Sequence, residues 1–354
     1  MGRKMLVYVG TYTDGQSDGI YSLRMDVSDG SLGSAELSGK ARNPSFLVPS
    51  PSGRFLYAVG ELATFEGRQS GVVSAFEIAD RSGKLRLLNR RQSGGAAPCY
   101  VTTDESGGNV LVANYDGGSV SVLPVGPDGR LDEPSCVVRH ESDGAACHAH
   151  SINVDPSGRF ALAADLGLDE VLVYRFDAAQ GRLSPNNPPA VGLPLMTGPR
   201  HLAFHPNGQL VYVINETAST ITVFDYDPKR GALSARQTVS TLPPGFAGTS
   251  ATAEIRVNPS GEFLYGSNRG HDSLVVFAID STGALTLIGH EPTRGRAPRH
   301  FTIDPSGQFL LAANRRSDTV VVFRIDRGTG KLIATGSIAQ VPCPVCVTFL
   351  PLRQ

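Results

Sequence analysis

Nine charged or imidazole side chains stand at comparable places in a pattern that repeats along the chain, and their types could do chemistry on a small anion. They are His148, His150, Arg200, His201, Glu216, Glu254, Arg269, Arg299 and His300. An imidazole or a carboxylate can accept a proton from water, and a guanidinium group binds carboxylate or phosphate through two parallel hydrogen bonds. These residue types predict a site that binds an anion and moves a proton. The alternative is that the Arg and Glu side chains pair across neighbouring repeats and serve stability alone.

The repeat itself is marked by a P-S-G-like triplet. Its glycine recurs at intervals of 46 to 54 residues, as Gly53, Gly107, Gly158, Gly208, Gly261 and Gly307. A short apolar strand precedes each triplet, a second strand follows it, and then come an alternating third strand and a G-x-L segment. Four short antiparallel strands per repeat are typical of a propeller blade.

The two ends of the chain supply one more copy. Residues 4–40 match the second, third and fourth strands of a repeat that lacks its first strand, and residues 343–351 match the missing strand. Pairing the two ends would close the ring and remove two exposed sheet edges. We therefore expect residues 1–354 to form one all-β domain, a seven-bladed β-propeller with four antiparallel strands per blade and a closing blade built from both termini. A row of small β-sandwiches is the alternative, but each repeat is too short to bury its own faces.

Two places in the repeat vary too much in residue type to be packing positions. At the start of the first strand, successive copies carry Cys99, His150, Arg200, Ala253 and Arg299, each followed by another variable residue. The end of the second strand varies in the same way, with Gly, Asn or Asp followed by Glu61, Tyr115, Leu166, Glu216, Arg269 and Arg315. These two strands are antiparallel neighbours, so both variable places should lie at one end of the blade. We expect them to line the central channel, where converging polar groups commonly bind or catalyse.

Composition excludes several classes of partner. A net charge of −1 gives no electrostatic reason to bind nucleic acid or an anionic membrane. The chain has no apolar run long enough to span a bilayer and no evident signal peptide, so a cytoplasmic protein is expected, as a monomer or a weak homo-oligomer. The absence of Trp disfavours the WD40 class of interaction propeller.

No metal and no cofactor are expected. His148 and His150 alternate along a strand and share a face, while Cys147 should point away, which leaves only two ligands for a metal. The chain also lacks a glycine-rich phosphate loop and a nucleophile elbow.

Four segments, HAHSINVDPSG, GPRHLAFHPNG, VINETAS and GSNRGHDS, resemble the seven-bladed lactonase family. This family contains the propeller type of 6-phosphogluconolactonase and the fungal carboxymuconate lactonizing enzymes. The resemblance spans the whole chain and implies a cytosolic, metal-free enzyme. It also implies catalytic roles for His150, Arg200, Glu216 and Arg269. For substrate binding, the residues that we expect are His148, His201, Glu254, Arg299 and His300.

The expected function is hydrolysis of a sugar lactone, with 6-phosphoglucono-δ-lactone as substrate, 6-phosphogluconate as product and a place in the pentose phosphate pathway. A muconate-type cycloisomerase, which uses no water, and a non-catalytic scaffold are the alternatives. Glu216 or His150 could be the base. If Glu216 lies against Arg269, the carboxyl pKa falls and His150 becomes the better base. The sequence leaves this choice open.

Overall fold

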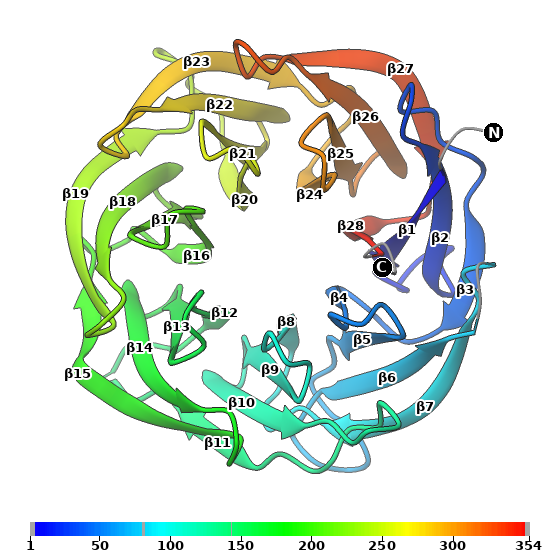
Figure 1. The fold of residues 1–354 in the computed structure, drawn as a ribbon, viewed down its shortest axis with the longest axis vertical. Helices are drawn as coiled ribbons and strands as arrows, with labels where there is room; N and C mark the ends of the chain where they lie inside the picture. The colour runs from blue at the N-terminus through cyan, green and yellow to red at the C-terminus, as the bar shows by residue number, and fades with distance from the viewer. Residues whose placement is uncertain (1–3, 80–81, 143, 351–354) are drawn as a thin grey trace.

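The computed structural model describes residues 4–79, 82–142 and 144–350, which form seven four-stranded antiparallel sheets around a central axis (Figure 1). The predicted seven-bladed β-propeller is confirmed. No helix in the described part of the chain is long and apolar enough to cross a membrane.

Within six of the blades the strands run in chain order from the axis outward (Figure 1). Two blades consist of β4 (Leu47–Pro49), β5 (Phe55–Gly60), β6 (Val72–Ile78) and β7 (Leu85–Gln92), then β8 (Pro98–Thr103), β9 (Asn109–Asn114), β10 (Ser119–Pro124) and β11 (Cys136–Arg139). The next two consist of β12 (Ala149–Val154), β13 (Phe160–Asp165), β14 (Glu170–Asp177) and β15 (Arg182–Gly192), then β16 (Pro199–Phe204), β17 (Leu210–Asn215), β18 (Thr220–Asp227) and β19 (Ala232–Ser240). Two more consist of β20 (Ala251–Val257), β21 (Phe263–Arg269), β22 (Ser273–Ile279) and β23 (Leu285–Pro292), then β24 (Pro298–Ile303), β25 (Phe309–Asn314), β26 (Thr319–Ile325) and β27 (Leu332–Gln340).

The seventh blade joins the two ends of the chain. Its strands are β28 (Pro344–Phe349), β1 (Lys4–Thr11), β2 (Gly19–Asp26) and β3 (Glu36–Lys40), in the order β28-β1-β2-β3. Val7 of β1 pairs with Phe349 of β28, and both side chains are buried. Position 351, the end of the expected strand 343–351, lies outside the described residues. The single domain expected for residues 1–354 stays a prediction.

The P-S-G triplet forms the turn between the first two strands of a blade because the residue before it closes the turn. In one copy, Oδ1 of Asp304 accepts hydrogen bonds from the backbone N–H groups of Gln308 and Phe309, both at 2.7 Å. Gly307 takes a positive φ of 70°, which favours glycine. The repeated triplet thus encodes a repeated hairpin.

Neighbouring blades contact each other through the G-x-L segment, which lies in the hairpin between the third and fourth strands of a blade. Gly330 has a φ of 70°, and its carbonyl oxygen accepts a hydrogen bond of 2.8 Å from the hydroxyl of Tyr265 in the preceding blade. A Cβ added at Gly330 would lie 2.3 Å from the ring of Phe263. Close packing of neighbouring sheets therefore depends on glycine at this turn.

Most inner strands carry a β-bulge near their beginning. In β16, Pro199 pairs with Asn215 and His201 pairs with Ile214, so Arg200 is an extra residue without a partner on β17. The same irregularity places His150 between paired residues in β12 and Arg299 in β24. A bulge re-aims side chains and interrupts the strict alternation of a strand. It explains how Arg200 and its neighbour His201 contact each other instead of pointing to opposite faces.

Candidate active site

The predicted catalytic residues come from three neighbouring blades at one end of the central channel. His150 lies on β12, Arg200 lies on β16, Glu216 directly follows β17, and Arg269 ends β21. The start of each inner strand and the end of its antiparallel neighbour meet at the same end of the blade, as the sequence predicts. Figure 1 shows the inner strands β12, β16 and β20 side by side around the axis.

Glu216 is held between two arginines. Its Oε2 atom lies 2.7 Å from Nε of Arg200 and 2.8 Å from Nη2 of Arg269. Burial on its own raises the pKa of the Glu216 carboxyl, but the two guanidinium groups outweigh burial and lower it. Glu216 is therefore a weak proton acceptor, and the choice of His150 as base stays a prediction.

Arg200 is the largest fully buried side chain of the described residues, with only 2% of its surface exposed. Its Nη1 atom donates to the carbonyl oxygen of Ala253 at 2.6 Å and to Nε2 of His201 at 3.1 Å. Burial, followed by the charge of Arg299, lowers the pKa of Arg200 to about 10. The guanidinium is still protonated at neutral pH, and it is fixed in direction by three partners.

A second carboxylate, Glu254, organises two of the histidines. Its Oε2 atom lies 3.1 Å from Nδ1 of His201 and 3.0 Å from Nε2 of His300, and its Oε1 lies 3.3 Å from Nε of Arg256. Arg200 can only donate, so Nε2 of His201 accepts and Nδ1 carries the proton. Nδ1 of His300 accepts from the backbone N–H of Val347 at 3.3 Å, which places the His300 proton on Nε2. Both imidazoles therefore donate to the same carboxylate oxygen.

These two imidazoles are buried in their neutral form. Burial is the main cause that lowers the pKa of His300 to about 3, against an opposing effect of Glu254. Burial and the charge of Arg200 likewise hold the pKa of His201 well below 6.5. Neither ring carries a positive charge at neutral pH.

Aromatic rings complete a closed layer around this network. The rings of Phe46 and Tyr100 lie 4.3 Å apart, and they contact His201 at 5.8 and 5.0 Å between ring centroids. His201, Glu254 and His300 each expose only 2% of their surface. The structure thus places these three predicted substrate-binding residues in a buried layer that supports Arg200, rather than at an open surface. Their contact with substrate stays a prediction.

His150 lies beside this layer, with its ring 5.1 Å from that of His201. Burial, Arg200 and His201 lower its pKa well below 6.5, so the imidazole is neutral at neutral pH. The nearest sulfur is Sγ of Cys99, 3.7 Å from Nδ1. Burial raises the pKa of the Cys99 thiol, which keeps it protonated and argues against a thiolate nucleophile.

His148 stands apart from the other predicted residues. Its ring stacks on Tyr115 with centroids 4.3 Å apart, and its Nδ1 lies 3.2 Å from the Tyr115 carbonyl oxygen. His150 meets the edge of the same tyrosine ring at 5.5 Å. No group of three or more His, Cys, Asp or Glu side chains in the described ranges is arranged to hold a metal ion.

Arg299 reaches the site from β24 and lies against Tyr12, a residue that the repeat pattern does not single out. Its guanidinium lies 5.5 Å from the ring centre of Tyr12, and that of Arg315 lies 4.6 Å from the same ring. The Tyr12 hydroxyl donates to both carboxylate oxygens of Glu61, at 3.0 and 2.9 Å. Tyr12 directly follows β1, so aligning the N-terminal partial copy on its second strand would have placed it in the variable column.

One expectation about the variable places is wrong. The Asn residues at the end of the second strands do not line the channel, because Asn215, Asn268 and Asn314 are completely buried. The side-chain amide of Asn268 donates to the carbonyl oxygen of Thr241 at 2.8 Å, and Asn314 bonds Thr293 in the same way at 3.0 Å. These amides tie strands together, and only the residue that follows each of them faces the channel end.

Comparison with known proteins decides the family. The family described as "Lactonase, 7-bladed beta-propeller" matches residues 6–349. The chain belongs to this lactonase family. The prediction of a lactonase enzyme is confirmed by that membership.

Relatives of this lactonase match it over most of their length. It is 35% identical to a 6-phosphogluconolactonase of Bacillus subtilis over 353 residues, which cover 98% of this chain and 99% of the relative. A 6-phosphogluconolactonase of Formosa agariphila is 35% identical to this chain, and the match covers 84% of this chain and 86% of the relative. The solved structure of a periplasmic gluconolactonase of Pseudomonas aeruginosa has a TM-score of 0.92 and 33% identity, and the match covers 99% of both chains.

Proposed function

We propose that this lactonase hydrolyses a phosphorylated sugar lactone, 6-phosphoglucono-δ-lactone, to 6-phosphogluconate, as a cytoplasmic step of the pentose phosphate pathway. The observation that carries the proposal is the Glu216 carboxylate between Arg200 and Arg269, with a neutral His150 against His201, the hydrogen-bond partner of Arg200. The names of the relatives from Bacillus subtilis and Formosa agariphila support the substrate.

The proposed reaction joins the oxygen of water to the lactone carbonyl carbon and breaks the bond between that carbon and the ring oxygen. His150 accepts a proton from the attacking water, because its imidazole is neutral while the Glu216 carboxylate is held by two guanidinium groups. The same proton then passes to the departing ring oxygen. The carboxylic acid that forms releases its own proton to the solvent at neutral pH.

The arginines stabilise the charge that develops during this reaction. As the tetrahedral intermediate forms, negative charge gathers on the former carbonyl oxygen, where a fixed guanidinium is more favourable than mobile water. Arg269 is the better candidate for direct contact, since 19% of its side chain is exposed against 2% for Arg200. Glu216 orients both guanidiniums. The buried layer of His201, Glu254 and His300 holds Arg200 in place through the hydrogen bond between Arg200 and His201.

Proton release tests this proposal directly. The purified protein is mixed with 6-phosphoglucono-δ-lactone in weak buffer with a pH indicator, and the rate is corrected for spontaneous ring opening. We expect catalysed proton release that persists in EDTA, since only two histidines share the predicted metal-like spacing. Failure to accelerate opening of this lactone, together with turnover of a carboxymuconate, would instead favour the cycloisomerase.

A further inference from the structure

A cavity of about 360 Å³ lies at the rim of the channel beside the proposed reaction site. Its wall is formed by the ends of β21 and β25, the loop that enters β24, and β24 itself. The feature that distinguishes it is five arginines, namely Arg269, Arg296, Arg299, Arg315 and Arg316.

The positive charge of this cavity is only partly compensated, because Glu216 pairs with Arg269 and the charges of Glu61 and Glu216 act on Arg299. Asp272 is the only acidic residue in its wall, and Oδ1 of Asp272 already accepts hydrogen bonds from the backbone N–H groups of Gly270 at 3.0 Å and Ala297 at 2.8 Å. Arg269 pairs with Glu216. In the described ranges, the other four arginines of the wall have no carboxylate within ion-pairing distance, although Arg299 and Arg315 lie against Tyr12.

The cavity shares Arg269 with the proposed reaction site. Arg269 contributes both to its wall and to the Glu216 cluster, and Arg299 lies on the inner strand next to His300. A ligand held among the arginines of the cavity would therefore reach Arg269, the partner of Glu216. Guanidinium groups with free N–H donors bind a phosphate dianion with several charge-assisted hydrogen bonds.

We propose that Arg296, Arg315 and Arg316, together with Arg299, form a phosphate subsite that selects lactones carrying a phosphomonoester. This inference rests on the proposed function and deepens it. In the lactone, the phosphate is carried by the CH2 group on the carbon that bears the ring oxygen, so it lies on the leaving-group side of the carbonyl carbon. The subsite would hold this end while the carbonyl lies at Arg269 and His150.

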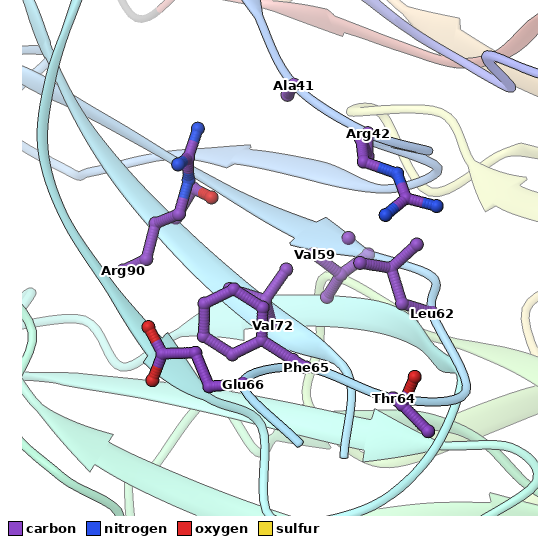
Figure 2. Close-up of a pocket in the computed structure, with 11 residues that line it drawn as sticks. Ala41, Arg42, Val59, Leu62, Thr64, Phe65, Glu66, Val72 and Arg90 are labelled. Carbon is purple, nitrogen blue, oxygen red and sulfur yellow. The ribbon is translucent and has the colours of Figure 1, made fainter. Parts of the chain in front are cut away.

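A second pocket of the same molecule lacks these properties and provides a control. It has a volume of about 220 Å³ and lies between β5, β6 and β7 and the loop after β5. Figure 2 shows Arg42 and Arg90 on opposite sides of Phe65 and Val72, with Glu66 near Arg90. Its two arginines are accompanied by a glutamate and apolar side chains, and none of the proposed reaction residues lines it.

The experiment uses three variants of the subsite: Arg316→Ala, Arg315→Ala and the double variant that carries both changes. Arg90→Ala, in the second pocket, is the matched control. Turnover is measured on 6-phosphoglucono-δ-lactone and on unphosphorylated glucono-δ-lactone, and thermal unfolding checks that each variant is folded. We expect kcat/KM for the phosphorylated lactone to fall about 10- to 100-fold for each arginine lost, the size of a hydrogen bond to a charged group. Turnover of the unphosphorylated lactone and both activities of Arg90→Ala should stay unchanged.

Calorimetry separates a failure of the subsite from a failure of the proposed function. Binding of 6-phosphogluconate and of gluconate is measured for the same proteins, and the wild-type preference for the phosphorylated acid should disappear in the double variant. Equal loss on both lactones, or no loss on either, would overturn the subsite even if lactonase activity is present. If wild-type protein opens neither lactone, the proposed function fails, while the binding preference still decides the subsite.

Discussion

Nε of Arg200 lies 2.7 Å from Oε2 of Glu216, and the two residues come from adjacent strand ends of one blade. The same carboxylate oxygen receives Arg269 from the next blade at 2.8 Å. One carboxylate thus fixes two guanidiniums, although the two arginines differ strongly in burial. This difference separates their contributions to activity and to stability.

Replacing either arginine should reduce activity, but only one replacement should strongly reduce stability. Arg269→Ala and Arg200→Ala should each lower kcat/KM by about 2–4 kcal/mol of transition-state stabilisation, the size seen for lost electrostatic donors. Arg200→Ala should also lower the free energy of unfolding by about 1–3 kcal/mol per buried partner left unpaired, since it bonds Ala253 and His201. Steady-state kinetics and denaturant unfolding measure the two effects. Full activity of both variants with reduced stability would show that the cluster is structural.

The proposed base should keep its function in mildly acidic solution. The pKa of His150 lies well below 6.5, so the imidazole stays neutral as the pH falls through the range in which an ordinary histidine becomes protonated. We expect kcat/KM to remain level through this range and to decline only at lower pH. His150→Ala should lower kcat more than it changes KM. A profile with an apparent pKa at or above 6.5 would exclude His150 as the base in this environment.

Acid should destabilise the fold through the buried histidine layer. His300 has a folded-state pKa of about 3 against 6.5 for an ordinary histidine, so the unfolded chain binds the proton more readily. Its stabilising contribution is complete above about pH 6.5 and is lost as the pH falls toward about 3. His300→Gln should flatten this part of the curve of unfolding free energy against pH. An unchanged slope in the variant would show that His300 does not contribute to it.

The blade contact at Gly330 gives a stability prediction with a built-in control. Gly330→Ala places a Cβ 2.3 Å from the Phe263 ring at a φ of 70°, so it should cost about 1–3 kcal/mol. Gly208→Ala is the matched variant, because Gly208 also has a φ of 70° and a Cβ there meets no atom within 4 Å. Thermal unfolding compares the two proteins. Equal melting temperatures would contradict the importance of this contact.

Removal of the closing strand should destroy the fold out of proportion to its length. Deleting residues 343–354 removes β28, which pairs with β1 and buries Val345, Val347 and Phe349. It leaves an unpaired edge that favours aggregation. Size-exclusion chromatography and thermal unfolding test this, with deletion of 351–354 as the control that leaves β28 whole. A monomer with an unchanged melting temperature would contradict the role of the closing blade.

The fold could be predicted because each blade is a local unit with its own markers. The triplet glycines, such as Gly307, mark the inner hairpins, and the leftover segments at the two ends supply one missing strand and its three partners. The main misinterpretation concerns Asn268 and its equivalents, which vary little yet were grouped with the lining residues. Their buried amides bond to backbone, and residue type alone does not distinguish such an amide from one that faces a channel.

The site could be predicted in part. Arg200, Glu216 and Arg269 meet as expected, because unusual polar residues at repeated positions converge on the axis. The closed layer formed by His201, Glu254 and His300 was not foreseen. The formation of this layer depends on the positions of the β-bulges in the inner strands. Hydrogen bonding between strands determines these positions, and the residue types do not. Tyr12 was overlooked because its partial repeat has no triplet glycine.

The bulge at the head of the inner strands has a consequence for how such a protein can change over evolutionary time. The residue that it inserts has no partner in the neighbouring strand, and in four of the blades it is Cys99, His150, Arg200 or Arg299. Substitution at this place leaves the ladder of the blade intact. New chemistry can therefore be sampled one blade at a time without a penalty to the scaffold, wherever the inserted side chain has not become as deeply embedded as Arg200. A ring of repeats with a common strand pattern can therefore acquire side chains for new substrates while its fold is kept.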